Sequence, residues 1–110
     1  MTPSDNETWL IDTGDDVIQK KVAEGRDALT ACERLVYCVW VADYSMRNAG
    51  DLRTASDLYA PFRDEAELLA EELGLAQTRV AFSLPADELE QAYFDFFDDV
   101  CAELRDCLKN

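Results

Sequence analysis

The sequence predicts an all-α protein, a single compact helical bundle around one buried central helix. Apolar residues make up 48% of the 110 residues, enough for a packed core in a chain of one-domain length. The most apolar stretch, residues 33–50, is too long for a typical strand. Elsewhere apolar residues recur at helical spacing, and glycine or proline separates the segments. Together these observations favour helices throughout.

The first segment differs in composition from the rest. Residues 1–14 are polar and turn-rich apart from Trp9, Leu10 and Ile11. We expect them to form an N-terminal arm, which leaves residues 15–110 as a single helical domain. The three apolar side chains should dock on that domain. A short helix, acidic at its start and closed by a glycine, should follow directly.

The central helix is expected at about residues 31–49. Its sequence LVYCVWV would suit a strand by propensity, so the flanking residues decide. Thr30 and Glu33 form a capping box, in which each side chain can accept a backbone N–H of the first turn. Gly50 is a natural stop. On a helix the large apolar residues point nearly all round the axis, which indicates a helix enclosed by others: Val41, Cys38, Leu35, Val39, Val36, Trp40 and Tyr44.

Three shorter helices and one long helix should complete the bundle. Asp51 is a candidate cap for the next helix, with Leu52, Ala55, Leu58 and Tyr59 on its apolar side. Residues 62–73 repeat apolar side chains at helical spacing between a proline and a glycine. Residues 75–83 form a short helical segment. The last helix, about residues 85–108, begins near a proline, which suits the first turn.

The charge balance restricts the classes of partner. The chain has 24 acids, 10 bases and no histidine, a net charge of −14. Such a surface repels nucleic acid and anionic lipid and attracts basic protein surfaces. No N-terminal targeting pattern is present, and the longest apolar run is far too short to span a membrane. We therefore expect a cytoplasmic protein with no direct contact to nucleic acid or membrane.

The last helix separates its acids from its apolar residues. On a straight helix, apolar side chains occupy one arc and a set of carboxylates occupies the arc between about 20° and 160°. These acids would extend over about 28 Å, or about 4 Å per charge, close to the spacing along one DNA strand. The candidate partner-binding ridge consists of Asp87, Glu88, Asp95, Asp98, Asp99, Glu103 and Asp106.

A ridge of this kind has a simpler explanation. Acidic faces most often serve only to keep a protein soluble. However, the pairs Asp95–Asp98, Asp95–Asp99 and Asp99–Glu103 place like charges three or four residues apart, where they repel by a few tenths of a kcal/mol each. A helix selected for stability alone would include lysines at such positions. The pattern therefore raises the case for a functional surface without excluding solubility.

Catalysis and metal binding have little support in the sequence. Without histidine, serine and cysteine nucleophiles lack their usual base, and the four glycines are isolated, so no phosphate-binding loop is expected. The acids of the last helix lie on a regular helix, whereas oxygen cages for metals need a loop. The four cysteines form two pairs spaced six residues apart, Cys32 with Cys38 and Cys101 with Cys107. Neither pair can bridge within a helix, so we expect buried free thiols, no cofactor, no metal and no enzyme.

Several short motifs resemble those of a bacterial domain-of-unknown-function family that includes an acidic DNA-mimic protein. The similarity covers roughly residues 30–105 and rests on Val39-Trp40, Asn48-Ala49-Gly50, the stretch ELGLAQTRVAFSLP, and the aspartates after Phe94 and Phe97. It implies an all-helical fold and protein binding through an acidic surface, and it supplies no catalytic residue.

One loop departs from that family. After the tryptophan the family pattern reads Asn-Gly-Gly-Phe-x-Gln, whereas this chain has Ala49, Asp51 and Arg53 at the three altered positions. A function carried by that loop is therefore in doubt for this chain.

The leading expectation is a non-enzymatic interaction protein whose acidic ridge docks on a basic protein, in its sharpest form a DNA-binding protein for which the ridge competes with DNA. A second hypothesis is a small-molecule or peptide binder with a pocket near Trp40, Asn48 and Gly50. A third is a plain homodimeric module that associates through residues 9–11 or through an exposed aromatic of the last helix.

Overall fold

The computed structural model describes the backbone of residues 3–109 and the side chains of residues 5–109. Within that range the chain forms six α-helices and one 3₁₀-helix, and no strand, which confirms the predicted all-α bundle. No helix in the described range is both long enough and apolar enough to cross a membrane. The elements are α1 Pro3–Glu24, η1 Arg26–Ala28, α2 Ala31–Ala49, α3 Arg53–Leu58, α4 Phe62–Leu73, α5 Ala76–Ser83 and α6 Ala86–Lys109.

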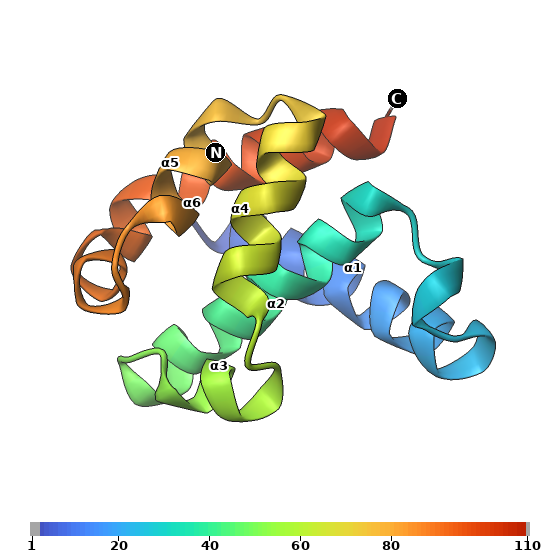
Figure 1. Ribbon diagram of the computed structural model, residues 1–110, viewed down its shortest axis with the longest axis horizontal. Coiled ribbons are helices and arrows are strands. Elements are labelled where there is room, and N and C mark those ends of the chain that lie inside the picture. Colours follow the sequence, from blue (N-terminus) through green and yellow to red (C-terminus); the bar gives the residue numbers. More distant parts are fainter. Residues whose placement is uncertain (1–2, 110) are drawn as a thin grey trace.

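Helix α2 is the central helix, with the bounds predicted from its capping residues. The Thr30 hydroxyl accepts the backbone N–H of Glu33 at 3.1 Å, and the Glu33 carboxylate accepts the backbone N–H of Thr30 at 2.9 Å. Gly50 ends the helix in the left-handed conformation, φ 74°, which costs a residue without Cβ little. α2 contacts α1, α3, α4 and α6 (Figure 1).

One side of α2 is less enclosed than predicted. Leu35, Val36 and Val39 are fully buried, but Trp40 is half-buried and Tyr44 is 44% exposed. These two rings stack on each other, with centroids 5.6 Å apart. Gly14 of α1 packs against the Trp40 ring, and the aromatic side chains cover part of this side of α2 themselves.

The predicted N-terminal arm is wrong, because residues 3–24 form one continuous helix. The predicted docking is confirmed for Leu10, which is fully buried, and for Trp9, which packs against the core. Ile11 is 42% exposed and does not dock. The part of the predicted arm before residue 3 lies outside the described residues.

Gly14 explains why the sequence suggested a turn where the structure has a helix. A Cβ atom at Gly14 would lie 2.3 Å from Cδ1 of Trp40. The glycine therefore permits α1 and the Trp40 ring to approach closely, at the cost of lower helix propensity. Because the glycine is required by packing against another helix, the sequence around residue 14 by itself suggests the end of a helix.

The segment after α2 follows the prediction in part. The Asp51 carboxylate accepts the N–H of Arg53, the first residue of α3, at 3.0 Å, so it caps this helix from two residues before it. Leu52 and Ala55 are buried as expected, but Leu58, at the end of α3, is 49% exposed.

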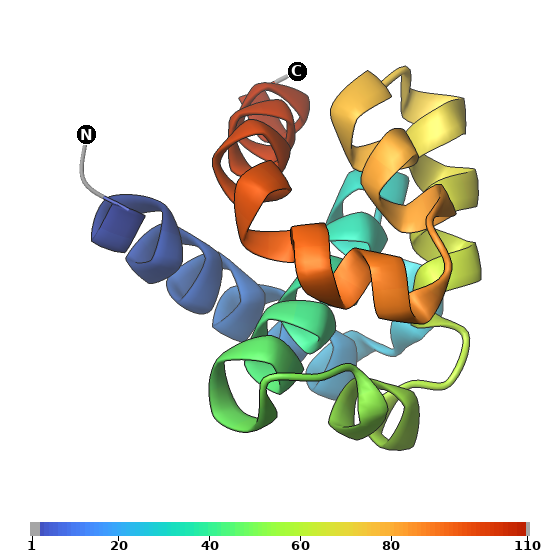
Figure 2. The same cartoon turned by 90° about the vertical axis from the view of Figure 1, so that its left-hand side faces the viewer.

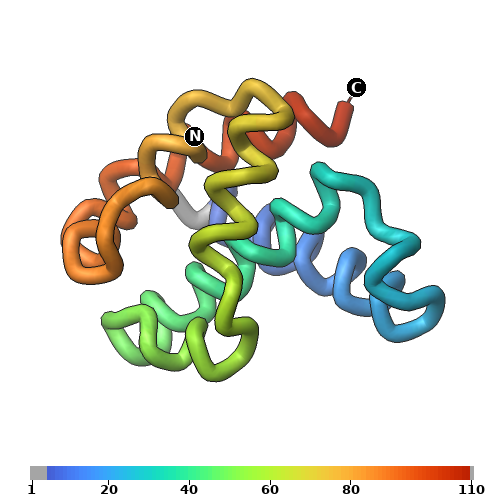
Figure 3. Tube along the Cα trace, in the orientation of Figure 1, coloured from blue at the N-terminus to red at the C-terminus, as the bar shows by residue number. Residues whose placement is uncertain are grey.

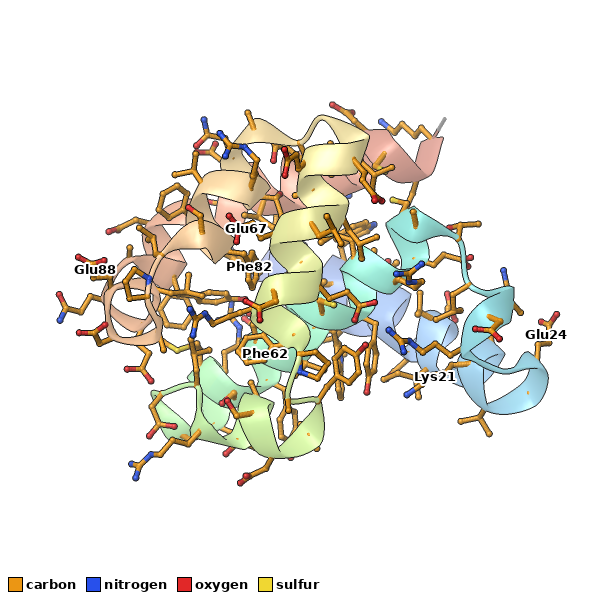
Figure 4. All side chains as sticks on the ribbon, in the orientation of Figure 1. Lys21, Glu24, Phe62, Glu67, Phe82 and Glu88 are labelled. Carbon is orange, nitrogen blue, oxygen red and sulfur yellow. The ribbon has the colours of Figure 1, made fainter. Side chains whose placement is uncertain are left out.

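Helices α4 and α5 cover the core from one side. α4 crosses over α2 and packs against α5, which packs in turn on α6 (Figures 1 and 3). Phe62 at the start of α4 and Phe82 in α5 point inward and are almost fully buried (Figure 4). This arrangement places α6 at the surface, with one side on α2 and α5.

Candidate acidic interaction surface

Helix α6 forms and orients as its pattern predicts. Pro85 precedes it, and the negative charges of Asp87 and Glu88 in its first turn interact favourably with the positive end of the helix dipole. One face is buried, with side chains three or four residues apart: Leu89, Tyr93, Phe97, Val100, Cys101 and Leu104. The opposite face is therefore left to the acids.

Six of the seven predicted ridge residues are exposed: Asp87, Glu88, Asp95, Asp98, Asp99 and Asp106. Figure 4 shows Glu88 at the edge of the molecule, pointing away from it. Glu103, the seventh, is half-buried and has a different role.

Glu103 caps the N-terminus of α5. Its carboxylate accepts the backbone N–H of Gln77 at 3.0 Å, the backbone N–H of Thr78 at 2.7 Å and the Thr78 hydroxyl at 2.8 Å. Thr78 is fully buried, so the two bonds from Thr78 satisfy donors that water cannot readily reach. Glu103 is therefore a structural residue and leaves the candidate surface.

Asn6 of α1 connects the acidic face to the only arginine of α6. Its amide nitrogen donates to Asp98 at 2.7 Å, and its amide oxygen accepts from Arg105 at 3.2 Å. Asn6 is 4% exposed, and the Arg105 guanidinium lies 4.7 Å from the centre of the Trp9 ring. The arginine is thus held toward α1 and does not neutralise Asp98. Sequence reasoning missed Asn6 because it placed residue 6 in an arm.

Four of the exposed acids of α6 make no ion pair in the described structure. Asp87, Glu88, Asp95 and Asp99 take part in none of the ion pairs found among residues 5–109. Those ion pairs use acids outside α6: Glu7, Glu33, Asp43, Asp51 and Glu65. Five of the ten bases are thus paired with acids outside α6: Lys20, Arg26, Arg34, Arg47 and Arg53.

The axis of α6 is bent, whereas the spacing argument assumed a straight helix. Figure 1 shows the start of α6 nearly end-on and the remainder from the side, and Figure 2 shows the reverse. The helix is continuous from Ala86 to Lys109 and wraps around the core. Asp87, at the start of α6, and Asp106, near its end, thus lie on helix segments that run in different directions. A uniform row of charges over the full length of α6 is not present.

Beneath the acidic face, Asp43 of α2 forms a buried polar contact with α6. It is 3% exposed and accepts the Tyr93 hydroxyl at 2.8 Å and the Arg47 guanidinium at 3.0 Å. Burial raises the pKa of Asp43, although the bonds from Tyr93 and Arg47 oppose the shift. Burial and the Asp43 charge also hold the pKa of Tyr93 well above its usual value. Asp43 and Arg47, four residues apart on α2, form an ion pair at 3.0 Å.

A second polar cluster lies on the far side of α2, around Glu65 of α4. Its carboxylate accepts from Arg26 at 2.8 Å, from Arg34 at 3.2 Å and from the Tyr59 hydroxyl. Burial raises the pKa of Glu65, but these donors outweigh it and hold that pKa below its usual value. The cluster joins η1, α2, α4 and the end of α3, and its contacts indicate a structural role.

The pocket hypothesis near Trp40 gains no support from the packing. Trp40 touches Gly14 on one side and stacks between Tyr37 and Tyr44. Asn48 donates to the backbone oxygen of Tyr44 at 2.8 Å, which uses its amide within the helix. Five grooves found on the described part of the chain are lined by residues other than Trp40, Asn48 and Gly50.

The dimer hypothesis keeps one candidate contact. Of residues 9–11 only Ile11 is exposed, so this segment offers little apolar surface to a second copy. Phe94 of α6 is 51% exposed, and the Arg47 guanidinium lies 5.1 Å from the centre of its ring. A single aromatic side chain is small for a stable dimer interface.

A metal site also has no support in the described residues. No group of three or more cysteine, aspartate or glutamate side chains there could hold a metal ion. Comparison with family models, curated proteins and solved structures found no match to this chain. The resemblance to the DNA-mimic family therefore stays a prediction, and the surface must be judged on its own geometry.

Proposed function

We propose that this protein is a non-enzymatic interaction protein that docks the acidic face of α6 on a basic protein surface. The central group is Asp95, Asp98 and Asp99, supported by Asp87 and Glu88 at the start of the helix. The partner class is a DNA-binding protein, for which this group competes with the phosphates of DNA.

The proposal rests mainly on exposed carboxylates of α6 that no basic side chain pairs with in the described structure. Asp95 and Asp99 are exposed and make no ion pair among the described residues, while Arg105 is held toward Asn6 and Trp9. Like charges at this spacing repel one another. A basic partner surface relieves that repulsion, so part of the binding free energy comes from electrostatic strain present in the free protein.

Because α6 is bent, we expect the contact to involve a short cluster of acids and not the full length of the helix. A short cluster keeps its local spacing on either side of a bend, whereas a long straight row does not. Asp95, Asp98 and Asp99 are within four residues of one another, or about 6 Å along a helix, comparable to two steps along a DNA strand. We therefore expect mimicry of a few neighbouring phosphates.

The test begins with capture of proteins from native lysate on the immobilised chain. We expect DNA-binding proteins to be enriched at low salt and released as the salt concentration rises, because salt screens the contact. For a captured protein, the triple variant Asp95→Asn, Asp98→Asn and Asp99→Asn should bind about tenfold or more weakly and show a shallower salt dependence. Duplex DNA should compete with the wild-type chain.

A matched control removes the same charge from another helix. Asp12, Asp15 and Asp16 of α1 are exposed, and their replacement by asparagine also lowers the net negative charge by three. This control should bind almost as well as wild type if the α6 face is the contact. Equal weakening by both variants would indicate attraction by net charge alone, and binding that does not respond to salt would contradict the proposal.

A further inference from the structure

An open groove lies where the start of α2 meets the end of α6. It has a volume of about 720 Å³ and is lined by Thr30–Glu33, Leu73, Leu75 and Asp106–Leu108. Two of the four cysteines, Cys32 and Cys107, line it together. This pairing differs from both sequence-adjacent pairs, which lie on single helices.

The two thiols lie side by side from different helices. Cys32 is in the first turn of α2 and Cys107 is in the last turn of α6, and both line the same groove. The two thiols are close enough for Cys107 to contribute to the raised pKa of Cys32. Cys107 is partly exposed, whereas Cys32 is buried and only 8% exposed. A small oxidant can therefore reach Cys107 from the groove, and Cys32 is its nearest thiol neighbour.

The other two cysteines are placed differently. Cys101 is fully buried in the core, and the Cys38 thiol lies 3.8 Å from the Glu65 carboxylate on another side of α2. Both are thus shielded from oxidants in the groove. Only the Cys32–Cys107 pair combines an accessible thiol with a second thiol in contact.

We propose that Cys32 and Cys107 form a reversible redox site, in which a small disulfide such as oxidised glutathione converts the two thiols into a disulfide that links α2 to the end of α6. This site does not depend on the acidic face. Its chemistry is thiol–disulfide exchange, in which the oxidant is reduced and the protein is oxidised by two electrons.

The exchange balances in two steps. The Cys107 thiolate attacks one sulfur of oxidised glutathione, the glutathione S–S bond breaks, and one glutathione thiolate leaves. The Cys32 thiolate then attacks the sulfur of Cys107, a second glutathione thiolate leaves, and the Cys32–Cys107 bond forms. The two protein thiol protons pass to solvent or to the leaving thiolates. Excess reduced glutathione reverses both steps.

The environment of Cys32 slows the second step. Burial raises the pKa of the Cys32 thiol, and the contact with Cys107 and the charge of Glu33 raise it further. Less thiolate is then present to attack the mixed disulfide. Asp106 also lines the groove and adds negative charge near both thiols.

The bond has a structural consequence because it joins distant parts of the chain. Cys32 and Cys107 are separated by 74 intervening residues, so the cross-link closes most of the chain into a loop and restricts the unfolded state. It also fixes the last turn of α6 against α2. The oxidised protein should unfold at a higher urea concentration, by about 1 M or more.

The experiment treats the reduced full chain with oxidised glutathione, blocks remaining thiols by alkylation and maps peptides without reduction. We expect an intramolecular Cys32–Cys107 disulfide, a mass lower by two hydrogens, no retained glutathione, and reversal by excess reduced glutathione. The variant Cys32→Ser should stop at glutathione attached to Cys107. The matched control Cys101→Ala, on the same helix, should close as wild type does.

Three results would overturn the proposal: glutathione that stays on Cys107 in the wild-type chain, a disulfide that involves Cys38 or Cys101, or a disulfide between two copies on a non-reducing gel. The wild-type peptide map requires no substitution, so the outcome does not depend on the folding of a variant.

Discussion

Gly14 and Trp40 illustrate how a single residue can carry a tertiary requirement. Glycine in the middle of a helix costs about 1 kcal/mol relative to alanine. In α1 it is nevertheless required, since a Cβ would lie 2.3 Å from Cδ1 and 2.7 Å from Cγ of the Trp40 ring. The indole is held between Tyr37 and Tyr44 and has little room to move.

We therefore predict that Gly14→Ala destabilises the protein by about 1–2 kcal/mol, because overpacking outweighs the gain in helix propensity. Urea unfolding followed by circular dichroism measures this change. In a Trp40→Leu background, where the ring is removed, the same substitution should be neutral or stabilising. Stabilisation by Gly14→Ala in the wild-type background would show that the close contact is absent.

At the scale of helices, α6 supplies carboxylates that cap two other elements. Glu103 accepts the first N–H groups of α5, and Glu90 accepts the backbone N–H of Leu52, just before α3, at 2.7 Å. Both short helices lack a capping side chain of their own at the N-cap position. Two acids that resemble surface charges in the sequence thus stabilise helix termini by long-range contacts.

Glu103→Ala should lower the free energy of unfolding by about 1–2 kcal/mol, because it removes the cap of α5 and leaves the buried Thr78 hydroxyl without its acceptor. The exposed Asp99, one turn earlier on α6, is the control. Asp99→Ala should change stability by no more than about 0.5 kcal/mol. Chemical denaturation of both variants distinguishes a structural acid from a surface acid, and equal effects would argue against the capping role.

At the scale of the whole molecule, charge is arranged in two ways. Bases cluster with acids at Glu65 and Asp43, where they connect helices, while the exposed face of α6 keeps its negative charge. The two clusters shift the pKa of their carboxyl groups in opposite directions. Glu65 has a pKa below its ordinary value of 4.5, whereas burial raises that of Asp43 above its ordinary 3.8. The two groups therefore act on pH stability in opposite directions.

A carboxyl group with a lowered pKa in the folded state contributes stability above its unfolded pKa and loses it as pH falls through the folded pKa. For Glu65 the loss should begin near pH 4.5 and continue below it. Glu65→Gln should unfold more easily at pH 7, by about 1–3 kcal/mol, and depend less on pH below that point. Unfolding midpoints between pH 3 and pH 7 test this, roughly spanning the range of carboxyl titration.

The control for this prediction is Glu67→Gln on the same helix. Glu67 is only half-buried and makes no ion pair among the described residues. Its pH profile should run parallel to that of the wild-type chain. Parallel profiles for all three proteins would show that the Glu65 cluster does not contribute to acid unfolding.

Local sequence rules were sufficient for most helix boundaries. The capping box at Thr30 and Glu33, the glycines after α2 and α4 and the proline before α6 each act within one turn of the helix, and each predicted end agrees with the structure. The apolar and acidic faces of α6 were predicted for the same reason, since residues three or four apart share a face on any helix.

The features that assign roles to individual acids and thiols depend on packing between distant segments. Asn6 reaches Asp98 across 92 residues, Glu103 reaches Thr78 across 25, and Cys32 of α2 shares a groove with Cys107 of α6. Gly14 suggested a turn in the sequence, because the side chain that requires a glycine there, Trp40, lies on another helix. Caps and faces of helices are marked by neighbours in sequence, whereas pairing across helices is decided by how their faces fit, so it becomes visible only in the folded chain.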